Sequence, residues 1–396
     1  MSKSQIYNFN IFYLFIIIVW PAIKNNFLSF DGAGRIEILF TFIAIIINYK
    51  IFFKVPKAMY FWLAWIIYCV ISIHYKGYGF VDYPFNLWLP HKLIIPIVAM
   101  ITVYSAASTK YEEFIRILFI YILIFAVIGS VVMSLNASAL KSDYGENTLS
   151  NGYLNSMIVI FPISVLMFKA KKINSVSLLL ISFMVLYGII LSGERKALAG
   201  LFIMIFGFFL SNNTSLKPKS VISIVLLTII AYFSVDYAIE NTQAGSRLSE
   251  DYISSEYQDN LFLKLVGNRA LMYVEGFNFF LQEPLTGLGL TNFISYSVDS
   301  RHILHTEYMV QLAECGIIGS ILFLFFYGSM IVRLIKAYFD RKNRATTVIY
   351  ITTLLAILVI AFTGWIYDCH VYFIFYGLLF AYCDSKILNG VKRTLK

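Results

Sequence analysis

Charged residues are scarce in this sequence. Asp, Glu, Lys and Arg together make up 13% of the 396 residues, whereas a soluble domain carries about 25%. Apolar residues make up 59%, and they come in long runs that short charged clusters interrupt. This balance excludes an ordinary water-soluble enzyme. It predicts an all-α, polytopic integral membrane protein that forms one membrane-embedded domain over residues 1–396.

Disulfide and metal-binding patterns are also missing. The four cysteines are Cys69, Cys315, Cys369 and Cys383, and no two of them are spaced as C-x-x-C. The sequence contains no D-x-D and no His, Asp and Glu cluster at metal-ligand spacing. We therefore expect no disulfide framework, no resident metal and no cofactor.

Twelve apolar segments approach the length of about 20 residues that a membrane-crossing helix needs. The first of them has no small-residue cleavage site, so it is predicted to be a membrane helix and not a removed signal peptide. The predicted spans lie near residues 7–23, 36–53, 58–74, 92–108, 114–134, 151–168, 174–192, 197–211, 220–236, 306–332, 346–364 and 370–384.

Basic and acidic residues sort to opposite sides of these spans. With both termini in the cytoplasm, 20 of the 31 Lys and Arg residues lie inside and 18 of the 22 Asp and Glu residues lie outside, as the positive-inside rule expects. The net charge of +9 therefore needs no nucleic-acid partner. The one long hydrophilic segment, 237–305, falls on the outer face between the ninth and tenth spans. Within it, residues 261–282 have the apolar content of a helix half-buried at the membrane surface.

Three adjacent charges lie where the chain has no length to spare. Residues 173–216 suffice for only two membrane crossings as helix, so Glu194, Arg195 and Lys196 must lie at the outer rim of the bilayer. Charges there are costly unless they are paired or reach water. They fit either a plain helical hairpin with solvated charges or a cationic site for an anionic headgroup.

One histidine stands at the start of a predicted span among charged residues. His305 is close in sequence to Arg301, Glu307 and Glu314, and an imidazole oriented by a carboxylate is the usual general base. A histidine in such a place can also be a surface or packing residue. Arg269, near the start of the predicted surface helix, is either a phosphate ligand or an ordinary surface arginine.

Three stretches form an ordered set of motifs on the predicted outer face. They are residues 192–197 (SGERKA), residues 267–289 (from GNRA to EPLTGLG) and residues 305–319 (from HTEY to ECGIIG). In order and spacing they match an arginine turn, an R…P-L-x-G-x-G loop and a histidine followed by an E-x-G-I-x-G helix start. With these motifs the sequence resembles the O-antigen polymerase and ligase superfamily of bacterial polysaccharide enzymes.

The resemblance implies a metal-independent glycosyltransferase of the C type, multi-pass in the bacterial cytoplasmic (inner) membrane. Its donor is expected to be a glycan linked to undecaprenyl diphosphate. The active site is expected on the periplasmic side, built from the 192–197 turn, the 237–305 loop and the start of the tenth span. Arg195 and Arg269 are expected to hold the diphosphate, and His305 to assist the acceptor hydroxyl. The implied substrate-binding residues at this site are Arg195, Lys196, Arg269, Arg301 and Glu307.

The residues leave three functions open. The first is a polysaccharide polymerase that joins lipid-linked repeat units; the second is an O-antigen ligase that moves the glycan to lipid A core; the third is a transporter or flippase. His305-Thr306-Glu307 departs from the His-Asn-Glu of many ligases, which favours the polymerase. The lack of internal repeats and of mid-span charges weighs against a transporter. The expected partners are undecaprenyl-diphosphate-linked oligosaccharide, membrane lipid, a chain-length regulator protein and a flippase.

Overall fold

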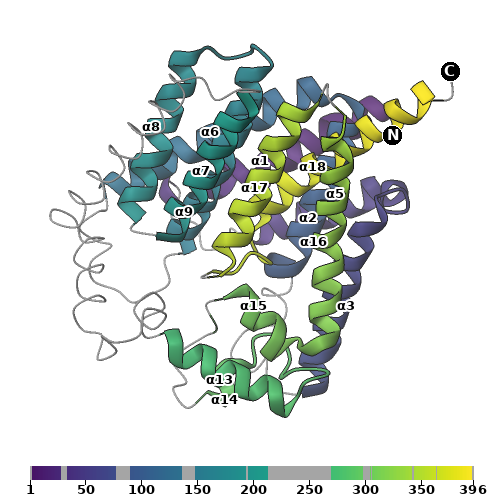
Figure 1. Ribbon diagram of the computed structural model, residues 1–396, viewed down its shortest axis with the longest axis vertical. Coiled ribbons are helices and arrows are strands. Elements are labelled where there is room, and N and C mark those ends of the chain that lie inside the picture. The colour runs from purple at the N-terminus through teal and green to yellow at the C-terminus, as the bar shows by residue number, and fades with distance from the viewer. Residues whose placement is uncertain are drawn as a thin grey trace.

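The described part of the protein is built of helices. The computed structural model describes residues 2–27, 34–76, 90–135, 148–192, 195–212, 269–297, 304, 306–340, 343–362 and 364–394. Every regular element within these residues is helical, which confirms the all-α prediction for them (Figure 1).

Long helices form the body of the protein, and short helices form one end of it. The α-helices are α1 (Lys3–Phe27), α2 (Gly34–Phe52), α3 (Lys57–Lys76), α5 (Ile95–Thr109), α6 (Tyr111–Leu135), α7 (Thr148–Lys169), α8 (Ser175–Ser192), α9 (Arg195–Asn212), α13 (Arg269–Gln282), α14 (Phe293–Tyr296), α15 (Glu307–Met309), α16 (Gly316–Tyr338), α17 (Arg344–Ile360) and α18 (His370–Thr394). Two π-helical segments, η1 (Pro90–Ile94) and η3 (Val310–Glu314), stand just before α5 and α16.

The length and apolar composition of these helices indicate that the protein is embedded in a membrane. Four described helical stretches are long and apolar enough to cross a bilayer, namely Lys3–Ile23, Lys92–Thr109, Tyr111–Val131 and Gly316–Tyr338. Shorter apolar helices accompany them. Outward side chains such as Ile46 and Leu324 are 70% and 63% exposed, which suits a surface that faces lipid.

The predicted spans agree with the helices in place, but their number stays a prediction. Eleven of the twelve predicted segments overlap a described helix. The remaining segment, 220–236, and most of the predicted outer loop lie outside the described residues. The expectation of one continuous helix over 306–332 is wrong. The chain there forms α15 and η3, turns at Cys315 and begins the crossing helix α16 at Gly316.

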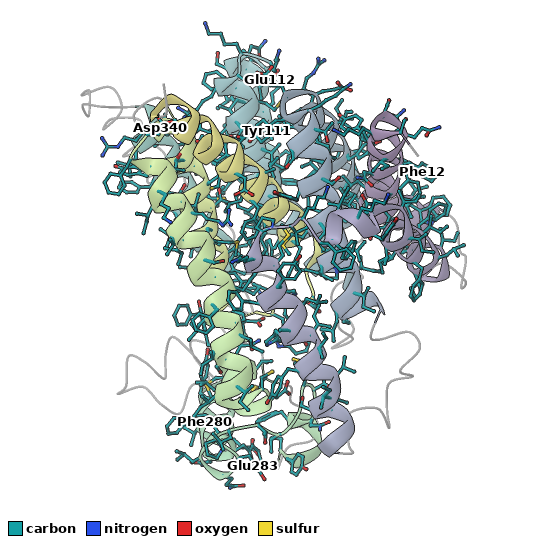
Figure 2. The ribbon with its side chains drawn as sticks, turned by 90° about the vertical axis from the view of Figure 1, so that its right-hand side faces the viewer. Phe12, Tyr111, Glu112, Phe280, Glu283 and Asp340 are labelled. Carbon is teal, nitrogen blue, oxygen red and sulfur yellow. The ribbon has the colours of Figure 1, made fainter. Side chains whose placement is uncertain are left out.

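The short helices gather at one end of the molecule, where α3 and α16 extend beyond the other long helices to meet them (Figure 1). Phe280 and Glu283, both predicted to be external, lie at that end. Glu112 and Asp340, both predicted to be cytoplasmic, lie at the opposite end (Figure 2). The N- and C-termini also lie away from α13 (Figure 1). The grouping of residues at the two ends is thus the one that the charge distribution predicts.

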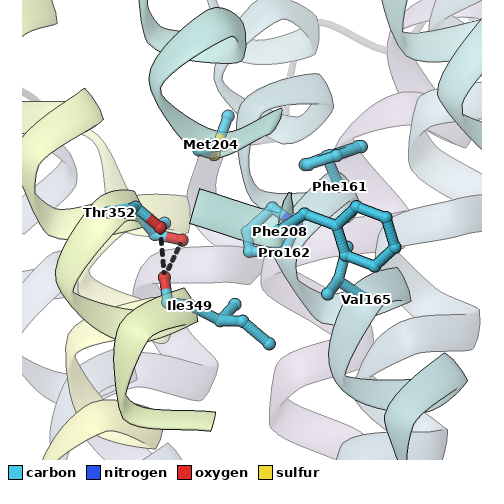
Figure 3. Close-up of a pocket in the computed structure, with 8 residues that line it drawn as sticks. Phe161, Pro162, Val165, Met204, Phe208, Ile349 and Thr352 are labelled. Atoms are coloured by element: carbon cyan, nitrogen blue, oxygen red, sulfur yellow. Dashed lines mark hydrogen bonds between the residues drawn. The ribbon is translucent and has the colours of Figure 1, made fainter. Parts of the chain in front are cut away.

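A tight helix contact away from the motifs contains a small apolar pocket. At this contact a Cβ at Gly207 of α9 would overlap Thr352 of α17, so the two helices pack closely. The pocket lies between α7, α9 and α17 (Figure 3). The hydroxyls of Thr352 and Thr353 both donate to the carbonyl oxygen of Ile349, at 3.2 and 2.7 Å. With its hydroxyls bonded internally, this pocket is a packing gap and not a site for a sugar.

Candidate functional site

The P-L-x-G-x-G loop docks backbone to backbone on the turn that precedes α16. Four backbone hydrogen bonds join the two segments. They run from Leu288 N–H to the Ala313 carbonyl (2.9 Å), from Gly289 N–H to the Glu314 carbonyl (2.8 Å), from Ile317 N–H to the Pro284 carbonyl (2.9 Å) and from Ile318 N–H to the Leu285 carbonyl (3.2 Å). The last two satisfy amide groups at the start of α16 that have no partner within their own helix. We call residues 284–293 together with 313–318 the motif clasp.

Two glycines make the motif clasp possible. Gly287 has φ +65° and Gly316 has φ +63°, a conformation that side chains rarely adopt. The two residues also face each other. A Cβ at Gly287 would lie 2.5 Å from the Glu314 carbonyl, and one at Gly316 would lie 2.6 Å from the Gly287 nitrogen. Close backbone contact therefore explains Gly287 of the second motif and Gly316 of the third.

The Glu314 side chain closes the motif clasp from within. Its carboxylate accepts the backbone N–H groups of Thr291 (2.8 Å) and Phe293 (3.3 Å). Burial raises the pKa of this carboxyl to about 7, while the two N–H donors act in the opposite direction. Thr291 itself has φ +67°, so the loop bends unusually to reach the carboxylate. Through these two N–H groups Glu314 holds the loop, and its predicted link to His305 falls outside the described residues.

Glu307 makes a second buried network. One carboxylate oxygen accepts the N–H groups of Ile366 (2.8 Å) and Tyr367 (3.2 Å), and the other accepts the Gln311 side-chain amide (2.8 Å). Gln311 in turn accepts the indole N–H of Trp65 at 2.8 Å. Burial raises the pKa of Glu307 to about 7. Both oxygens are engaged by internal donors, so the role of Glu307 in binding substrate stays a prediction that the contacts do not favour.

The chain on either side of His305 is tied to the connection between α17 and α18. We call residues 361–369 the α17–α18 loop. The indole N–H of Trp365 donates to the carbonyl of Leu304. On the other side, the N–H of Glu307 and the hydroxyl of Thr306 donate to the carbonyl of Ala361, at 2.9 and 3.4 Å. His305 and Arg301 themselves lie outside the described residues, whereas Leu304 and Thr306 are both tied to this loop.

Helix α13 reaches the same loop. The hydroxyl of Tyr273 donates to the carbonyl of Phe362 at 2.6 Å. Arg269 is the first residue of α13, four positions before Tyr273, and residues at this spacing share one face of a helix. The Arg269 side chain lies outside the described part. Tyr273 thus brings the second motif to the α17–α18 loop.

The start of α9 also contacts this loop. A Cβ at Gly364 would lie 2.8 Å from the Lys196 ammonium nitrogen, so the end of the Lys196 side chain rests against the Gly364 backbone. Arg195 precedes Lys196 and begins α9. Its side chain lies outside the described part. Lys196, from the 192–197 motif that is predicted to hold an anionic headgroup, therefore lies against the α17–α18 loop as well.

The three motifs thus converge on one short loop. Lys196, Tyr273 and Thr306 come from three separate stretches, yet each contacts residues 361–364. The loop is further held by Lys92, whose ammonium lies 2.7 Å from the Asp368 carboxylate. Sequence reasoning missed this loop. Its only signal is a run of aromatic and polar residues, GWIYD, between two apolar spans.

Comparison with known proteins agrees with the motifs. No curated protein matches the chain. Residues 179–324 match the O-antigen ligase family, and this range contains the hairpin turn, α13 and the motif clasp. The resemblance seen in the sequence is therefore confirmed over this range: residues 179–324 match an O-antigen ligase domain, which is consistent with the O-antigen polymerase and ligase superfamily.

Proposed function

We propose that the protein is a polysaccharide polymerase that transfers glycan from undecaprenyl diphosphate to the acceptor sugar of another lipid-linked repeat unit. The observation that carries the proposal is the convergence of the three motifs on the α17–α18 loop. It supports one site that unites two arginines and a histidine. The family match supports a membrane enzyme of the O-antigen polymerase or ligase type.

The reaction suits these residues. The bond between the anomeric carbon and the phosphate oxygen breaks while the acceptor oxygen bonds to the anomeric carbon. Negative charge grows on the departing diphosphate, and the guanidinium groups of Arg195 and Arg269 neutralise it with paired N–H donors. The acceptor hydroxyl gives its proton to His305. No metal or cofactor takes part in this mechanism.

The remaining cations have supporting roles in the same proposal. Lys196, next to Arg195, adds positive charge where the diphosphate lies, and Arg301 binds the glycan near His305. The site faces the periplasm from the cytoplasmic membrane, and both termini lie in the cytoplasm. A flippase supplies the lipid-linked substrate, and a chain-length regulator protein acts with the enzyme.

The second candidate is an O-antigen ligase, because the matching family carries that description. A ligase shares the donor chemistry and differs in its acceptor, lipid A core. Transport of the lipid-linked sugar is the third candidate, and the family match gives it no support.

A gel of surface polysaccharide from a deletion strain tests the proposal. Loss of a polymerase leaves a single repeat unit on lipid A core, which is the expected result. Loss of a ligase instead leaves long chains on the lipid carrier and none on the core, and that pattern would contradict the polymerase. Loss of a flippase would remove lipid-linked repeat units from the outer face altogether. Re-expression of the wild-type chain in the same strain is the control.

A further inference from the structure

Phe362 presents an exposed aromatic ring on the α17–α18 loop. Its side chain is 57% exposed, although its backbone is fixed by the Tyr273 hydroxyl at 2.6 Å. The ring of Tyr308 packs against it, with centroids 4.6 Å apart, and the Tyr308 hydroxyl donates to the Leu358 carbonyl at 2.8 Å. The Phe362 ring is therefore held by its neighbours while much of its surface stays open.

The position of this ring links it to the acceptor side of the proposed reaction. Phe362 follows Ala361, whose carbonyl accepts hydrogen bonds from Thr306 and Glu307, the two residues that come directly after His305 in the sequence. Tyr308, which supports the ring, belongs to the same stretch. In the proposed mechanism His305 receives the proton of the acceptor hydroxyl, so a sugar beside Phe362 is the acceptor sugar.

We propose that Phe362 is a sugar-binding residue whose exposed face stacks on a pyranose ring of the acceptor glycan. The C–H face of a pyranose is apolar and flat, and a fixed aromatic ring offers it a matching surface at low cost in side-chain entropy. Because Phe362 belongs to the loop that Lys196 and Tyr273 of α13 contact, a stacked sugar lies next to the proposed diphosphate site. This inference rests on the proposed function for its assignment to the acceptor.

A direct binding measurement tests the subsite without relying on transfer. The full-length protein is placed in lipid nanodiscs and titrated with the water-soluble repeat-unit oligosaccharide released from the polysaccharide of the source strain. Saturation-transfer NMR reports the Kd. Phe362→Ala is expected to weaken binding about tenfold, and Phe362→Trp is expected to retain it. Phe362→Leu should bind as weakly as the alanine variant, because leucine keeps apolar character but loses the flat face.

The matched control is Phe339, an exposed aromatic residue packed on Tyr338 just after α16. The Phe339 side chain is 78% exposed, and the two ring centroids are 6.2 Å apart. Phe339→Ala should leave oligosaccharide binding unchanged. Wild-type affinity in Phe362→Ala would overturn the subsite, and so would wild-type affinity in Phe362→Leu, since an apolar contact with lipid would then explain the residue. Intact, Phe362-dependent oligosaccharide binding in a protein that transfers no glycan supports the subsite and counts against the polymerase alone.

Discussion

Arg195→Lys and Arg269→Lys are each expected to lower glycan transfer by about 10²–10³-fold, nearly as much as alanine at the same positions. Lysine keeps the positive charge but loses the planar pair of N–H donors that grips two phosphate oxygens. The measurement is transfer by the purified full-length protein from a lipid-linked donor, with and without a chelator. Lys196→Arg and Lys196→Gln serve as comparison variants. They should lose less, because adjacent residues of a helix point about 100° apart.

Two results would remove the metal-free diphosphate clamp from the mechanism. One is full activity of both arginine-to-lysine variants, which would mean that charge alone suffices. The other is complete loss of wild-type transfer in the presence of the chelator.

Glu307→Gln is expected to lower transfer by about 10²-fold, the cost of misplacing a reacting group by a small distance. The variant cannot satisfy the network around it. A glutamine side chain at this position that accepts the N–H groups of Ile366 and Tyr367 turns its own amide toward the Gln311 amide, which places donor against donor. If Gln311 rotates, the clash moves to the indole N–H of Trp65.

Exchanging the two residues should restore activity. In Glu307→Gln combined with Gln311→Glu, the amide introduced at position 307 donates to the carboxylate introduced at position 311, whose other oxygen accepts the Trp65 indole N–H. Every donor then has an acceptor again. Activity near wild type is expected for this double variant and low activity for either single change. In a His305→Ala background, Glu307→Gln should cause little further loss if Glu307 acts by placing His305. If the exchange variant, Glu307→Gln with Gln311→Glu, is as inactive as Glu307→Gln alone, the Glu307 carboxylate acts on the substrate itself.

Apolar runs were sufficient to predict most helices, because the length of a crossing is fixed by the bilayer. The predicted segment 114–134 and the observed α6, Tyr111–Leu135, differ by only a few residues at each end. The break at Cys315 could not be predicted this way. It depends on the bonds that the P-L-x-G-x-G loop makes to the first amides of α16, and hydropathy carries no information about partners distant in sequence.

The candidate chemical groups are visible in the sequence and stay a prediction, whereas the loop on which the three motifs converge could not be predicted. An arginine at a tight hairpin and a histidine among charges are visible in the sequence, since their side chains are costly to place at a membrane rim. The α17–α18 loop contributes mostly backbone groups. Glu307 binds the backbone N–H groups of Ile366 and Tyr367, and Lys196 touches the backbone of Gly364. Many other residue types at these positions would present the same backbone groups.

The convergence of the motifs on the α17–α18 loop can be measured directly by cross-linking Lys196→Cys to Gly364→Cys. The four native cysteines, all free, are first replaced, and a protease site is inserted after Gly245 in the predicted outer loop. A bifunctional thiol reagent that spans about the length of a lysine side chain is added before cleavage. Lys172→Cys with Gly364→Cys is the control, since Lys172 lies at the other end of α8. The two fragments are expected to stay joined only for the 196–364 pair. Fragments that separate in both pairs would contradict the convergence of the motifs on this loop.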